Sequence, residues 1–90
     1  MGAHGGAVAI ATGASRGIGR GIAQRLTQEG ARVVITARKP EPLAQAVAAF
    51  GGDEYAVGLA GNAADEQHQD EAIALARSRF GGLDYLVNNT

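Results

Sequence analysis

The sequence predicts an α/β fold built on a parallel sheet, and three observations lead to this prediction. Apolar, often β-branched runs alternate with segments in which apolar residues recur at helical spacing. A glycine-rich turn at residues 12–19 joins the first apolar run to the first helical segment. The connections between segments are short, as expected for right-handed crossovers between parallel strands. We therefore expect the order β-α-β-α-β-α-β in one small domain covering residues 1–90.

Four strands are expected. The first is the apolar run at 7–11, and the second, at 32–37, is rich in β-branched residues and predicted to be buried on both faces. The third, at 54–60, is weaker because Gly58 interrupts it, and the fourth covers 83–87.

Three helices are expected between these strands, and their ends carry recognisable residues. The first runs from Ile18 to Glu29, with Gly30 just past its end. Pro40 and Pro42 suit the first turn of the second helix, which ends before the glycine pair at 51–52. Asp65 is a suitable N-cap for the third helix, which a second glycine pair closes at 81–82. Its apolar spacing predicts one face made of Ile73, Ala76, Arg77 and Phe80.

Composition excludes several functional classes. A net charge of −1 gives no reason to expect nucleic acid or an anionic membrane as a partner. The absence of cysteine rules out disulfides and thiolate metal sites, and no apolar run approaches the roughly 18 residues of a membrane span. The first residues lack the basic and apolar regions of a secretory signal. We expect a cytoplasmic protein without a metal site.

The glycine turn has the character of a phosphate-binding site. Gly13 permits a sharp turn out of the first strand, Gly17 permits close approach of the backbone to a ligand, and Gly19 permits tight packing of helix on strand. The free N–H groups of the first helical turn, at the positive end of the helix dipole, then favour a diphosphate.

Two motifs together resemble a known family. The turn, Thr12-Gly-x-x-x-Gly-x-Gly, and the segment 86–90, Leu-Val-Asn-Asn-Thr, resemble elements of the classical short-chain dehydrogenases/reductases, whose second element has alanine where Thr90 stands. The resemblance implies a Rossmann-type, doubly wound sheet of order 3-2-1-4, of which this chain supplies the N-terminal half. Within the family, the TGASRGIG turn and an asparagine at the adenine position most resemble the 3-oxoacyl-[acyl-carrier-protein] reductases.

The resemblance implies a nicotinamide dinucleotide as cofactor, and the residues favour NADP(H). NAD-specific sites usually place an acidic residue at the end of the second strand, but no acid occurs here before Glu41. Arg38 is instead positioned to meet a 2′-phosphate, and Arg16 is the second cation that NADP-preferring members carry. The cofactor-binding residues expected on this basis are Gly13, Ser15, Arg16, Gly17, Ile18, Gly19, Arg38, Asn62, Ala63 and Asn89.

Two of these assignments have their own reasoning. Asn62 and Ala63 stand where the family has Asp-Val beside the adenine, and an asparagine retains a side-chain acceptor. The alternative, that Asn62 is simply a turn residue after Gly61, stays open. Asn89 would stabilise the sheet and line the path of the cofactor. His4 and His68 are expected to be solvated, because one is terminal and the other lies in the polar stretch DEQHQDE.

No catalytic residue is predicted within this chain. The chemistry of the family needs Tyr-x-x-x-Lys and an upstream serine, whereas Lys39 is the only lysine and precedes both tyrosines. We expect the chain to be the truncated cofactor-binding half of an oxidoreductase, inactive alone, that reduces a carbonyl, such as a 3-oxoacyl thioester, or oxidises a secondary alcohol. The complete protein would act on a small molecule or acyl thioester as a homotetramer or homodimer.

Two alternative functions share parts of this pattern. The first is a nucleotide-binding fragment without catalysis, which needs a complementing C-terminal half. The second, an S-adenosylmethionine-dependent methyltransferase, is disfavoured because an acid would be expected at the tip of the second strand.

Overall fold

The computed structural model describes residues 6–13, 17–62 and 64–87. Within these ranges, strands and helices alternate along the chain as predicted. The elements are β1 Val8–Thr12, α1 Gly17–Gln28, β2 Arg32–Ala37, α2 Pro40–Ala49, β3 Ala56–Ala60, α3 Glu66–Phe80 and β4 Tyr85–Val87.

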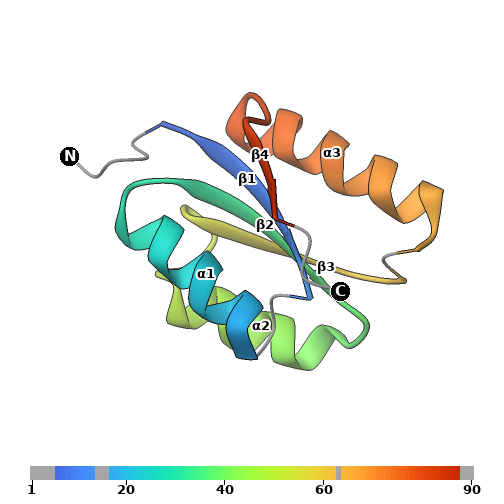
Figure 1. The fold of residues 1–90 in the computed structure, drawn as a ribbon, viewed down its shortest axis with the longest axis horizontal. Helices are drawn as coiled ribbons and strands as arrows, with labels where there is room; N and C mark the ends of the chain where they lie inside the picture. The colour runs from blue at the N-terminus through green and yellow to red at the C-terminus, as the bar shows by residue number, and fades with distance from the viewer. Residues whose placement is uncertain (1–5, 14–16, 63, 88–90) are drawn as a thin grey trace.

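The strands form one sheet in the order β3-β2-β1-β4, and every neighbouring pair is parallel. This confirms the predicted order 3-2-1-4. Helices α1 and α2 cover one face of the sheet and α3 covers the other, as Figure 1 shows. The parallel sheet is the one that the alternating pattern predicted, and its doubly wound order is the one that the family resemblance implied.

The register brings the carboxyl ends of three strands into line. Thr12 of β1 lies opposite Thr36 of β2. Thr36 in turn lies opposite Leu59 of β3, and Ala37 lies opposite Ala60. The turns that follow these strands consequently emerge along the same edge of the sheet.

Small residues let the helices lie close to the sheet. On the side of α1 and α2, the buried cluster consists of Ala9, Ala11, Ala23, Val33, Ile35, Leu43, Ala46, Phe50 and Ala56. Gly58 belongs to this arrangement, because a Cβ at its position would lie 3.1 Å from the Cβ of Leu43. The prediction that Gly58 interrupts β3 is wrong: it pairs with Ile35 and gives α2 room to approach.

The opposite face carries the main correction to the sequence analysis. Its buried cluster consists of Val8, Ile10, Val34, Ala72 and Ala76. Ala76 of the predicted face is buried and Ile73 and Phe80 pack against this cluster, but Arg77 is exposed. The buried residues of α3 are His68, Ala72 and Ala76. His68 is buried, with 6% of its surface exposed, so the expectation that it is solvated is wrong.

The helix ends confirm the predicted capping residues. Gly30 adopts a φ of +95° after α1, where the N–H of Ala31 donates to the carbonyl of Leu26 at 2.9 Å. The carboxylate of Asp65 accepts from the N–H of Gln67 at 3.0 Å and caps α3. Gly81 closes α3 with a φ of +85°.

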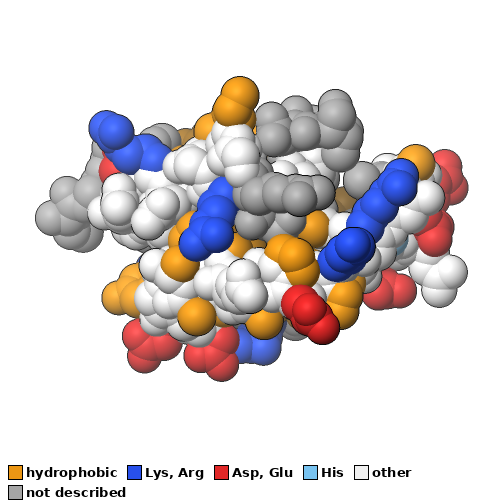
Figure 2. Space-filling model, turned by 90° about the horizontal axis from the view of Figure 1, so that it is seen from below, with side chains coloured by type: hydrophobic (Ala, Val, Ile, Leu, Met, Phe, Trp, Pro, Cys, Tyr) orange, Lys and Arg blue, Asp and Glu red, His pale blue; other side chains and the backbone are white. Residues whose placement is uncertain are grey.

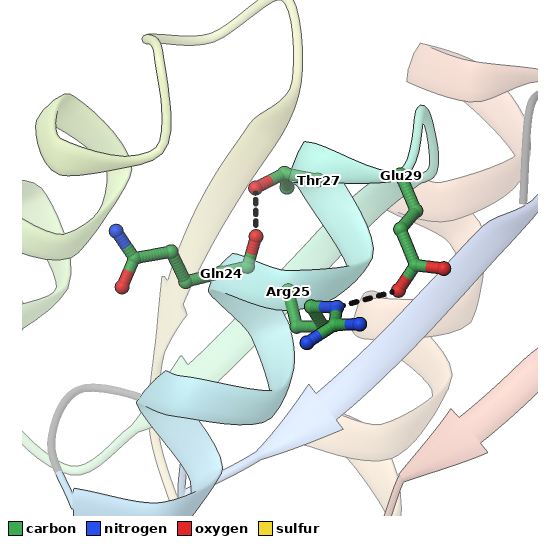
Figure 3. Close-up of polar contacts among 4 residues, drawn as sticks. All are labelled: Gln24, Arg25, Thr27 and Glu29. Carbon is green, nitrogen blue, oxygen red and sulfur yellow. Dashed lines mark hydrogen bonds and ion pairs between the residues drawn. The ribbon is translucent and has the colours of Figure 1, made fainter. Parts of the chain in front are cut away.

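The last turns of α1 carry two side-chain contacts, which Figure 3 shows together. The hydroxyl of Thr27 donates to the carbonyl of Gln24 at 2.8 Å. Arg25 and Glu29 form an ion pair at 3.0 Å, one turn apart on the helix surface. Such an exposed pair contributes only about 0.3–0.5 kcal/mol to stability, so α1 depends mainly on its buried face.

β3 and β4 each begin two residues later than predicted. Before β3, the N–H of Tyr55 closes a turn on the carbonyl of Gly52, and the guanidinium of Arg32 lies 4.6 Å from the centre of the Tyr55 ring. Before β4, Asp84 pairs with the start of β1: its N–H donates to the carbonyl of Val8 at 2.8 Å, and its carboxylate accepts from the Val8 N–H at 2.9 Å.

Charge is distributed over the surface without a dominant sign. Figure 2 shows acidic and basic side chains interspersed on the face covered by α1 and α2. Of the helices in the described ranges, none combines the length and the apolar character needed to cross a bilayer.

Candidate functional site

The candidate site lies along the carboxyl edge of the sheet. Gly13 follows β1, Arg38 follows β2, and Gly61 and Asn62 follow β3. Because β1, β2 and β3 are adjacent and end in register, these residues lie along one edge. Open α/β sheets bind their ligands at this edge.

Two of the described glycines of the turn adopt backbone conformations that favour glycine. Gly13 has a φ of +63° and Gly17 a φ of +66°, a region that favours glycine. A Cβ placed on Gly17 would meet no atom of the described chain within 4 Å, so the backbone there is open to a ligand. Gly19 is buried on the inner face of α1, consistent with close helix–sheet packing. Ser15 and Arg16 lie outside the described residues.

The first turn of α1 is suited to an anion. The helix begins at Gly17, and its first turn contains no acidic residue. The N–H groups of a first helical turn have no partner within the helix, and the helix dipole adds positive potential there. Ile18, of which 76% is exposed, is available for apolar contact beside this turn. A diphosphate therefore fits the chemistry of this end of α1.

Arg38 supplies the cation of the site. It is exposed and directly follows the last residue of β2. In the part of the chain that the structure describes, no carboxylate pairs with its guanidinium. Lys39 is the N-cap residue of α2, and its side chain makes no capping hydrogen bond.

Asn62 has a turn role in the structure. Its side-chain oxygen accepts from the N–H of Ala64 at 2.9 Å, and its backbone carbonyl accepts from the N–H of Asp65 at 3.0 Å. This is the turn interpretation that the sequence left open. The side-chain amide N–H groups remain as donors toward a ligand, so the predicted adenine contact still has chemistry available. Ala63 and Asn89 lie outside the described residues.

Two buried polar residues near this edge were missed by the sequence analysis. Thr36 lies near the carboxyl end of β2, and 2% of its surface is exposed. His68 lies in the first turns of α3. The available signal was the spacing of His68 four residues before Ala72 and eight before Ala76, which places all three on one helix face.

Other features of the described residues lie apart from this edge. A groove of about 290 Å³ is lined by residues at the far ends of α1 and α2, including Gln24, Gly30, Phe50 and Tyr55. Within the described ranges, no group of three or more His, Asp or Glu side chains is arranged to hold a metal ion.

Comparison with known proteins identifies relatives over nearly the whole chain. The model of the family described as short chain dehydrogenase matches residues 7–90. L-rhamnose 1-dehydrogenase (NAD(P)(+)) of Azotobacter vinelandii is 45% identical over 89% of this chain and 33% of its own. The 3-oxoacyl-[acyl-carrier-protein] reductase FabG of Haemophilus influenzae is 40% identical over 93% of this chain and 34% of its own.

A solved structure supports the same fold. Glucose dehydrogenase of Caenorhabditis elegans in its apo form superposes with a TM-score of 0.88 and 37% identity, over 97% of this chain and 38% of that chain. The chain thus spans about a third of the length of the curated relatives it matches. These relatives have different substrates in their names, and the 3-oxoacyl reductase is one of several with similar identity. The comparisons therefore do not single out the 3-oxoacyl-[acyl-carrier-protein] reductases, the subgroup that the sequence was predicted to resemble most.

Proposed function

Because the chain belongs to the short-chain dehydrogenase family, we propose that its carboxyl edge binds the dinucleotide of an oxidoreductase, with NADP(H) preferred over NAD(H). One observation carries this proposal. The open backbone of Gly17, the acid-free first turn of α1 and the exposed guanidinium of Arg38 follow adjacent strands that end in register.

Each group has a distinct task in this proposal. The amides of the first turn of α1 hold the diphosphate, and the exposed side chain of Ile18 packs on the cofactor beside it. Arg38 and Arg16 bind the 2′-phosphate. At about 1.5 kcal/mol for each charge-assisted hydrogen bond, two such contacts give about a hundredfold preference for the phosphorylated cofactor. When bound, the nicotinamide supplies or accepts a hydride.

We propose that the complete protein reduces a carbonyl or oxidises a secondary alcohol. Sugar dehydrogenases and a 3-oxoacyl thioester reductase are both among the relatives, and both chemistries interconvert a hydroxyl and a carbonyl. A 3-oxoacyl thioester is one candidate substrate, because the TGASRGIG turn resembles that of the 3-oxoacyl-[acyl-carrier-protein] reductases. The Tyr-x-x-x-Lys pair of the family does not occur in these 90 residues.

Calorimetric titration of NADPH and NADH tests the cofactor assignment. Replacing Arg38 by Asp should weaken NADPH binding by more than about tenfold and affect NADH much less, because only the 2′-phosphate loses its partner. Arg79→Ala is the matched control, because it removes an exposed cation from the last turn of α3, away from the carboxyl edge. It should change the affinity for neither NADPH nor NADH. Equal losses for NADPH and NADH in Arg38→Asp would contradict the preference.

The second candidate function is a nucleotide-binding fragment that has no catalysis of its own and needs a complementing half. These 90 residues contain the glycine turn and the carboxyl edge but no Tyr-x-x-x-Lys pair, as this function requires. Both functions predict NADPH binding. Oxidation of NADPH with a carbonyl substrate by the intact protein supports the enzyme, and binding without turnover in that protein supports the fragment.

A further inference from the structure

A buried histidine lies beneath the candidate site. His68 is 6% exposed, and its Nε2 atom is buried without a hydrogen-bond partner among the described residues. It occupies the N-terminal part of α3, whose inner face continues through Ala72 and Ala76 into the core. A polar ring at a position that would suit an apolar side chain needs a structural reason, because burying an unpaired polar atom is costly.

The ring of His68 is matched to Gly61. A Cβ placed on Gly61 would overlap the Nδ1 atom of His68 and lie 2.7 Å from its Cε1 atom. Gly61 is itself fixed to the sheet, because its N–H donates to the carbonyl of Ala37 at 2.9 Å. The imidazole therefore packs directly on the backbone at the end of β3. The turn that carries Asn62 begins at the next residue.

Thr36 is the second buried polar residue of this region. Its hydroxyl is buried without a partner among the described residues, and the residue is 2% exposed. Side chains alternate along a strand, so Thr36 lies on the same face of β2 as Val34, which packs in the α3 cluster. His68 extends the same cluster from the helix side. Both polar groups thus lie between the sheet and α3, toward the carboxyl edge.

We propose that His68 is a positioning residue for the adenine end of the nucleotide site, an inference that rests on the proposed function. Its ring packs on Gly61 and holds the turn that presents the side-chain amide of Asn62. One water molecule bridges its Nε2 to the hydroxyl of Thr36, since neither atom has a partner among the described residues, and this bridge fixes the first turns of α3 to β2. Gly61 and His68 form a matched pair, in which the missing side chain just after β3 makes room for the ring on α3.

The matched pair predicts that a defect in one residue is relieved by a change in the other. Gly61→Ala forces a methyl group into the ring, displaces the Asn62 turn and should weaken binding of the adenine end by about tenfold. His68→Ala leaves the turn unsupported and should weaken it less. In Gly61→Ala/His68→Ala, the new methyl enters the space left by the ring, so affinity should recover above that of Gly61→Ala alone.

The experiment titrates the intact protein with two probes below its unfolding temperature. Adenosine 2′,5′-bisphosphate carries only the adenine end, and reduced nicotinamide mononucleotide carries only the other end. The Gly61 and His68 variants should bind adenosine 2′,5′-bisphosphate with altered affinity and reduced nicotinamide mononucleotide with unchanged affinity. Gly82→Ala is the matched control, because a Cβ there meets no described atom within 4 Å. Thr36→Val should also shift the Nε2 resonance of His68 in nitrogen NMR spectra.

The outcomes separate this inference from the proposed function. Wild-type protein that binds adenosine 2′,5′-bisphosphate, together with Gly61→Ala that binds it equally well, overturns the inference alone. So does a double variant that is no better than Gly61→Ala, or an equal loss for both probes. An unchanged Nε2 resonance in Thr36→Val overturns the water bridge to Thr36. Wild-type protein that binds neither adenosine 2′,5′-bisphosphate nor NADPH overturns the proposed function as well.

Discussion

Replacing Gly17 by Ala should separate ligand binding from stability at the glycine turn. Gly17 has a φ of +66°, where a residue with a Cβ costs about 1–2 kcal/mol. Part of this cost is offset, because alanine restricts the unfolded chain and contributes about 0.4–1 kcal/mol. The added methyl meets no described atom within 4 Å, so no steric cost arises from the described part of the protein. The net destabilisation should be about 1 kcal/mol.

The effect on the cofactor should be much larger than the effect on folding. If the diphosphate rests on the backbone of this turn, the added methyl group projects from that backbone toward the diphosphate. We expect NADPH affinity to fall by more than about tenfold, while the melting temperature falls by about 4–8 °C. Thermal unfolding and calorimetric titration measure the two effects in the same preparation.

Gly81→Ala is the control for this comparison. Gly81 has a φ of +85° and equally open space around an added methyl, but it closes α3 at the opposite end of the sheet. It should lose similar stability and keep NADPH affinity. If Gly17→Ala binds NADPH as the wild type does, or if Gly81→Ala loses as much affinity, the placement of the diphosphate is refuted.

Substitutions at four further positions test the contacts that support the site. Asp65→Ala removes the cap of α3 and should cost about 1 kcal/mol in urea unfolding, with Asp65→Asn nearly neutral. Asp84→Ala removes the acceptor of the Val8 N–H and should lower the free energy of unfolding by about 1–2 kcal/mol. Asp84→Asn retains a side-chain oxygen and should lower it less. Equal losses of stability in the two variants would argue against this hydrogen bond. Leu43→Ala should cost about 2–5 kcal/mol, and Gly58→Ala should become less harmful in that background; additive effects would show that the two positions do not touch.

Most of the fold was predictable because local signals agreed with the final packing. The β-branched run of β2 was predicted with its observed bounds, Arg32–Ala37, and the residues at Gly30, Asp65 and Gly81 marked helix ends correctly. The errors arose where tertiary contacts decided the outcome. Gly58 suggests a break when considered alone, but beside Leu43 it provides the room that α2 needs.

The burial of His68 shows the limit of local sequence reasoning. Its neighbours are almost all polar or charged, so local composition indicated a solvated position. Beside Ile73 and Phe80 of the predicted face, the buried residues of α3 are His68, Ala72 and Ala76. Two of these three are alanines, which give a weak apolar signal. Only the absence of a side chain at Gly61, seven residues earlier in the sequence, makes room for the ring.

The sequence predicted which residues lie at the candidate site better than it predicted their hydrogen bonds. Gly13, Gly17 and Arg38 lie at the expected edge because the alternating pattern predicted parallel strands and the family resemblance implied their order. The hydrogen bond that ties the Asn62 side chain to Ala64 could not be predicted, because turn and ligand roles use the same side-chain oxygen. The roles of these residues toward a cofactor stay predictions for the titrations above.

The contact between Val8 and Asp84 joins residues 76 positions apart and has a consequence for biosynthesis. β1 lies between β2, which the ribosome makes soon afterwards, and β4, which it makes much later. Throughout most of the synthesis of these residues, one flank of this apolar strand therefore lacks its hydrogen-bonding neighbour β4. The nascent chain is most exposed to misassociation in that interval, and molecular chaperones that bind extended apolar segments would act on it then.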